Sequence, residues 1–151
     1  MPPDIHVTLW REILDHADRG TFCWNREIWK QLELIQDAQV LSSLRRCNRV
    51  ALLQVGQANW PFQLYLDHLE RIKDSYGAFI SEYNGNRKAT VNLVDCSIVC
   101  LGVTLELPVL SMETPPKQPS PKKMRIPELC MKENVLHYDV NQFLRQEGIT
   151  L

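Results

Sequence analysis

Residues 93–148 constrain the fold more than any other part of the sequence. Apolar stretches long enough for a helix alternate there with short apolar runs of strand length, and a loop rich in proline and lysine lies between them. The pattern predicts helix, strand, loop, short helix, strand and helix, in that order. Strands separated by helices favour parallel pairing, so this part of the chain indicates an α/β fold.

Two carboxylates stand directly after the two predicted strands. Glu113 follows the apolar run 107–110, and Asp139 follows the run 135–138. In open parallel sheets, ligands bind beyond the carboxyl ends of the strands. Glu113 and Asp139 therefore mark the edge at which we expect a functional site.

The chain before residue 93 is predicted to be mainly helical, because its apolar residues recur at helical spacing. Asn25 is a good helix cap, and the segment 84–86, Asn-Gly-Asn, is a good helix stop. The expected elements are a helix capped by Asp4 and stopped at Gly20, a strand over 21–24, a helix after Asn25, a helix over 37–49, a strand or apolar helix end over 50–55, and a long helix from Pro61 to Tyr83.

The length of 151 residues predicts a single domain, 1–151. A net charge of -1 provides no overall attraction to nucleic acid or membrane, so any such site must be local. No apolar run is long enough to span a bilayer. The five cysteines are odd in number, form no Cys-x-x-Cys pair and follow no secretory leader. They are therefore expected to be reduced thiols in a cytoplasmic protein.

The carboxylates are the strongest source of chemistry in the sequence. There is no glycine-rich phosphate loop, the histidines lack metal-ligand spacing, and no serine or cysteine has an evident base as partner. Asp95 begins the apolar helix of the last third, where a helix cap is its ordinary structural role. A helix start and a strand end can also bring Asp95 and Glu113 together as oxygen ligands of Mg²⁺ or Mn²⁺.

Three blocks of sequence resemble a known family. They read Val-Asp-Cys-Ser-Ile-Val at 94–99, Pro-Val-Leu-Ser-Met-Glu at 108–113 and Lys-Met-Arg-Ile-Pro-Glu-Leu-Cys at 123–130. This combination resembles the C-terminal half of PIN-like domains, and most closely a branch of unassigned function with a Lys-x-Lys-Ile-Pro-x-x-Cys block. The resemblance implies a three-layer sandwich around a central, mostly parallel sheet.

PIN domains are metal-dependent ribonucleases, and many are toxins of toxin–antitoxin pairs. The resemblance implies that Asp95 and Glu113 are catalytic and hold Mg²⁺ or Mn²⁺, which activates water and stabilises the leaving oxygen. It also implies RNA as substrate, and it makes an antitoxin protein, or a second copy of the chain in a homodimer, a possible partner. The lack of a long apolar run separately predicts no association with a membrane.

The chain departs from the family pattern at two acids. The family opens with a strand that ends in an Asp, and this strand is expected to be missing before Met1. The family also carries a Glu in the helix after its second strand, where Gln31 stands here. An amide can coordinate a metal but cannot neutralise its charge. The resemblance therefore implies low activity.

Basic residues Lys122, Lys123 and Arg125 follow Glu113 in the proline-rich loop. They are expected either to hold RNA phosphates or to keep a solvated loop soluble. Two alternatives to the ribonuclease remain. The chain is either an inactive PIN-like descendant that binds an antitoxin or another protein, or an unrelated small α/β binding module in which Asp95 is only a cap.

Overall fold

The computed structural model describes residues 7–34, 42, 44, 51–53, 56, 60–85 and 90–149. The chain divides into two compact units, residues 1–60 with 149–151 and residues 61–148. Each unit combines helices with one pair of parallel strands, as expected for the α/β class. None of the helices in the described ranges combines the length and apolar character that a membrane crossing requires. The prediction of a single domain stays a prediction.

The first unit contains helix α1 (Val7–Asp18), strand β1 (Cys23–Asn25), helix α2 (Arg26–Leu32) and strand β2 (Ala51–Leu53). β1 and β2 pair in parallel, so the undecided segment 50–55 contains a strand. The side chain of Asn25 accepts a hydrogen bond from the Ile28 N–H at 3.0 Å, which confirms it as the cap of α2.

Aromatic side chains build much of the core of the first unit. Ala17, Trp24 and Leu44 are buried, and the rings of Trp24 and Trp29 stack with centroids 6.0 Å apart.

Asp4 lies outside the described residues. Most of the helix predicted for 37–49 does as well, although residues 42 and 44 are helical.

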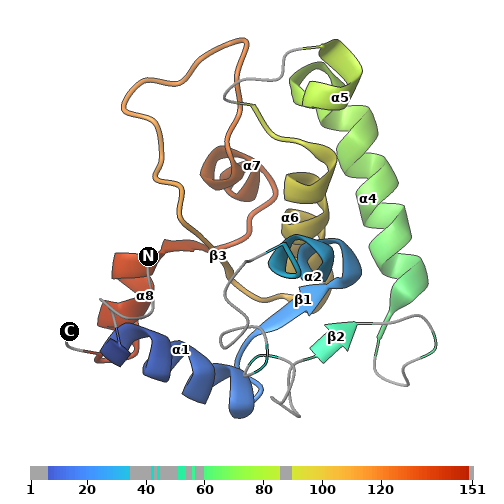
Figure 1. Ribbon diagram of the computed structural model, residues 1–151. Coiled ribbons are helices and arrows are strands. Elements are labelled where there is room, and N and C mark those ends of the chain that lie inside the picture. Colours follow the sequence, from blue (N-terminus) through green and yellow to red (C-terminus); the bar gives the residue numbers. More distant parts are fainter. Residues whose placement is uncertain are drawn as a thin grey trace. The chain divides into compact units, whose positions relative to one another are not determined.

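The second unit is built on two helices that pack along each other, α4 (Phe62–Tyr76) and α6 (Leu93–Leu105) (Figure 1). The thiol of Cys100 on α6 donates a hydrogen bond to the Tyr65 carbonyl on α4 at 3.1 Å. Helix α6 is rich in Leu, Val, Ile and Cys and is apolar on nearly every side. This pattern is expected of a helix that lies inside its unit.

The remaining elements of the second unit follow the predicted order. They are strand β3 (Val109–Ser111), helix α7 (Ile126–Lys132), strand β4 (His137–Asp139) and helix α8 (Val140–Gln146), and Figure 1 shows the long loop that separates β3 from α7. β3 and β4 pair in parallel, with Val109 opposite His137 and Ser111 opposite Asp139. The prediction of parallel pairing in this part of the chain is confirmed.

The long helix predicted from Pro61 to Tyr83 is correct as far as Tyr76 and wrong beyond it. Helix α4 ends at Tyr76, a short 3-10 turn follows over Gly77–Phe79, and Ile80 is extended before the short helix α5 (Ser81–Asn84). Ile80 is fully buried, and the next N–H, that of Ser81, donates to the Val91 carbonyl at 2.9 Å. Packing of Ile80 and this bond to a distant segment outweigh the local helical pattern.

The buried thiols of the second unit are expected to be unreactive in the folded protein. Burial raises the pKa of Cys96, Cys100 and Cys130 to about 12. At pH 8 such a thiol is ionised in about one molecule in ten thousand, and the thiolate is the reactive form. A thiol-exchange dye should therefore label these three cysteines only after denaturant is added. Rapid labelling of all three in the native protein would contradict this packing.

Candidate metal centre

Asp95 lies in the first turn of α6 and is tied to the residue that caps the helix. The cap is Asn92, so the expectation that Asp95 itself is the cap is wrong by three positions. The Asn92 side chain accepts the Asp95 N–H at 2.8 Å, and Asp95 Oδ2 accepts the Asn92 N–H at 2.9 Å. This reciprocal capping box satisfies two backbone donors that the helix leaves unpaired.

Glu113 lies just beyond the carboxyl end of β3, as the sequence predicts. Its Oε2 atom accepts the Ile126 N–H at 2.9 Å, at the first residue of α7. The bond closes the loop 114–125 onto its own starting point. Asp139, at the end of β4, is a helix cap, because its Oδ1 atom accepts the Gln142 N–H at 2.8 Å.

The structure brings the charges of Asp95 and Glu113 within range of each other. Burial raises the pKa of Asp95, the hydrogen bond from the Asn92 N–H opposes the rise, and the negative charges of Glu113 and Glu82 add to it. A half-buried carboxylate that faces two like charges gains from a bound cation, because the cation relieves both the repulsion and the lost solvation.

Glu82 is the carboxylate that the sequence analysis missed. It lies on α5, its two oxygens each accept the Leu93 N–H at 3.2 Å, and one oxygen accepts the Ser81 hydroxyl at 2.9 Å. The first N–H groups of a helix need partners from outside it. The sequence shows that the Leu93 N–H at the start of α6 needs an acceptor. It does not show that Glu82 is this acceptor, because the turn after α4 decides where Glu82 lies.

The donor set of Asp95 and Glu113 fits a hard divalent cation. One oxygen of each carboxylate accepts a backbone N–H, and the other accepts no hydrogen bond from a described residue. Mg²⁺ is commonly bound by one or two carboxylates together with water and phosphate oxygens. Within the described ranges, no three His, Cys, Asp or Glu side chains are grouped so that they alone could hold a metal ion.

A serine–histidine contact lies beside Glu113. Ser111 Oγ is 2.9 Å from His137 Nε2, and the same oxygen accepts the Glu113 N–H at 3.1 Å. The sequence shows no evident base partner for any serine, and this contact appears only in the folded chain. Burial lowers the pKa of His137, and the negative charges of Asp139 and Glu113 partly oppose this. The contact depends on the pairing of β3 with β4, which brings together residues 26 positions apart.

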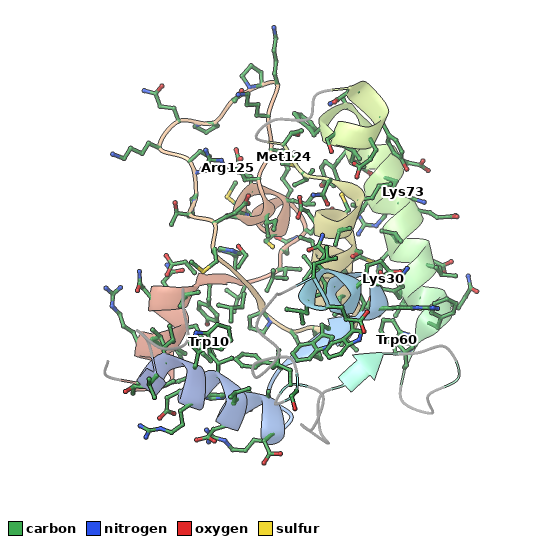
Figure 2. The ribbon with its side chains drawn as sticks, viewed as in Figure 1. Trp10, Lys30, Trp60, Lys73, Met124 and Arg125 are labelled. Atoms are coloured by element: carbon green, nitrogen blue, oxygen red, sulfur yellow. The ribbon has the colours of Figure 1, made fainter. Side chains whose placement is uncertain are left out.

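The basic loop is exposed at its charges and anchored by one apolar side chain. Lys122, Lys123 and Arg125 are exposed, whereas Met124 between them is only 2% exposed. Figure 2 shows Met124 and Arg125 at the end of the loop, directly before α7. Because Ile126 donates to Glu113, the end of this loop is fixed next to that carboxylate.

Gln31 is an exposed residue of α2 in the first unit, whereas Asp95 and Glu113 belong to the second. The prediction that Gln31 stands at a family acid position of the same site as Asp95 and Glu113 stays a prediction.

No protein-family model, no curated protein and no solved structure matches this chain.

Proposed function

We propose that the chain is a PIN-like, metal-dependent ribonuclease of the toxin type, with weak activity. The observation that carries the proposal is the half-buried carboxylate of Asp95, whose pKa is raised by burial and further by the negative charge of Glu113, which lies just beyond the end of β3. The PIN-like three-layer sandwich is part of the same proposal. It is supported by the parallel pairing of β3 with β4 and by the helix α6 that precedes them.

Asp95 and Glu113 would hold Mg²⁺ or Mn²⁺ through the oxygens that no described N–H occupies. The bound cation supplies a water of lowered pKa and stabilises negative charge on a leaving oxygen. The two carboxylates fix the position of the site, since one is tied to the start of α6 and the other to the start of α7. Lys122, Lys123 and Arg125 would hold the RNA phosphates beside it.

The test is Mn²⁺ titration by calorimetry together with cleavage of a fluorescent RNA. We expect weak Mn²⁺ binding by the wild type and its loss in Asp95→Asn and in Glu113→Gln. Both replacements keep an oxygen that can accept the same backbone N–H but remove a negative charge from the ligand set. Asp74→Asn, at an exposed position on α4, is the matched control. A wild type that binds no Mn²⁺, or an unchanged Asp95→Asn, contradicts the proposal.

Replacing Lys122 and Lys123 with alanine should weaken the binding of single-stranded RNA and flatten its dependence on salt. Each lost phosphate contact reduces the slope of log affinity against log salt by about 0.7, so two lysines account for about 1.4. Lys30 and Lys73, on α2 and α4 (Figure 2), provide a control double replacement of the same net charge. An equal slope in the Lys122/Lys123 variant and the wild type would leave the loop as a solvated connector.

The second candidate is an inactive descendant that binds an antitoxin or another protein. The observation that favours it is the capping role of both carboxylates, because Asp95 and Glu113 each stabilise a helix start without any metal. Under this candidate the wild type binds no Mn²⁺, and Asp95→Asn lowers only the stability. The calorimetric titration therefore separates the two functions.

A further inference from the structure

The turn after β3 is held by a chain of hydrogen bonds that crosses both strands. His137 on β4 contacts the Ser111 hydroxyl, with Nε2 and Oγ 2.9 Å apart. The Ser111 oxygen accepts the Glu113 N–H at 3.1 Å, and the Glu113 carboxylate accepts the Ile126 N–H at 2.9 Å. The backbone and the side chain of Glu113 are thus each fixed by a separate hydrogen bond.

The two bonds of the Ser111 oxygen have different consequences. The bond from the Glu113 N–H sets the backbone direction just beyond the strand, which is the turn that a serine two residues earlier can stabilise. The contact with His137 gives the same hydroxyl a second partner, and this favours the Ser111 rotamer in which Oγ lies 2.9 Å from the ring nitrogen. His137 therefore acts on Glu113 through Ser111.

We propose that Ser111 and His137 are positioning residues that hold Glu113 for a divalent cation. The inference rests on the proposed function and adds two residues to it. Neither residue needs to touch the cation. Partners of a metal-binding carboxylate orient it, and their loss commonly weakens metal affinity by about 10- to 100-fold.

The test is the Mn²⁺ dissociation constant of four variants, measured by calorimetry alongside the melting temperature of each. Ser111→Ala and His137→Ala should weaken binding by about tenfold. Ser111→Thr keeps a hydroxyl, and the amide of His137→Gln keeps both a donor and an acceptor at nearly the reach of Nε2, so both variants should bind Mn²⁺ nearly as well as the wild type. This rescue is not expected if the residues only contribute to general stability.

Ser120 provides a matched control. Its hydroxyl oxygen also accepts the N–H two residues later, from Lys122 at 3.3 Å, but it lies within the loop. Ser120→Ala should leave the Mn²⁺ affinity unchanged. Wild-type affinity in Ser111→Ala, or no rescue by Ser111→Thr and His137→Gln, overturns the positioning role alone. Absence of Mn²⁺ binding in the wild type overturns the proposed function, and the positioning role with it.

Discussion

Replacing Arg71 with methionine is expected to lower the free energy of unfolding by about 2 kcal/mol. The guanidinium donates two hydrogen bonds to the Glu133 carboxylate, and the Tyr76 hydroxyl donates a third at 2.8 Å. The Glu133 side chain is only 4% exposed. Removing one partner of a buried pair costs about 3–5 kcal/mol, because the other charge stays buried alone. The Arg71 side chain is 47% exposed, so in the variant water replaces part of the interaction that the Glu133 carboxylate loses. The expected cost is therefore smaller than for a fully buried pair.

The effect of Arg71→Met is expected to depend on pH. Burial alone would raise the pKa of Glu133, but the hydrogen bonds from Arg71 and Tyr76 and the charge of Arg71 bring it below its ordinary value of 4.5. A carboxyl group with a lowered folded-state pKa stabilises the fold above its unfolded pKa, and this stability is lost as the pH falls through the folded pKa. The difference between variant and wild type should be complete at neutral pH and shrink in acid.

Urea denaturation followed by circular dichroism measures both effects. Arg145→Met is the matched control, since the exposed Arg145 forms no ion pair with a described residue. The double variant with Glu133→Leu should recover part of the loss, because removing both charges leaves none buried without a partner. Equal stability of Arg71→Met and Arg145→Met at neutral pH would show that the ion pair contributes little.

Replacing Gly102 with valine is expected to lower the free energy of unfolding by about 3 kcal/mol or more. A Cβ atom at this position of α6 would lie 2.8 Å from Val109 Cγ2 and 3.0 Å from both the Leu107 carbonyl oxygen and Val135 Cγ1. The backbone of Leu107 cannot move freely, because its N–H donates to the Gly102 carbonyl at 3.0 Å, and β3 is held by its pairing with β4. Gly102 therefore allows α6 to approach β3 closely.

The loss of unfolding free energy should grow with the size of the side chain placed at position 102. Gly102→Ala adds only the Cβ and gains about 1 kcal/mol of helix propensity, so its loss should be smaller than that of the valine variant. Gly77→Ala is the control, because its Cβ would meet only Tyr83 at an ordinary 3.7 Å. Comparable stability of Gly102→Val and the wild type in urea would mean that α6 and β3 do not pack closely.

The order of elements in the last third was predictable because its signals are local. The length of its apolar stretch distinguishes α6, and the spacing of apolar residues distinguishes α8, from the short strands between the helices. Asn25 caps α2 through a residue three positions away. Gly85 and Gly148 adopt the left-handed conformation that lets a helix end. Such features depend on neighbours along the chain, so the sequence alone can reveal them.

Contacts between distant segments were decided only by the tertiary structure. Periodicity placed Ile80 inside a helix, yet its burial and the bond from Ser81 to Val91 end that helix early. The sequence shows no evident base partner for Ser111, and the pairing of β3 with β4 places His137 beside it. Arg71 and Glu133 are 62 positions apart, and no local pattern relates them. Their pairing follows from how the helices pack, since burial of the Glu133 carboxylate is favourable only where a donor from another helix reaches it.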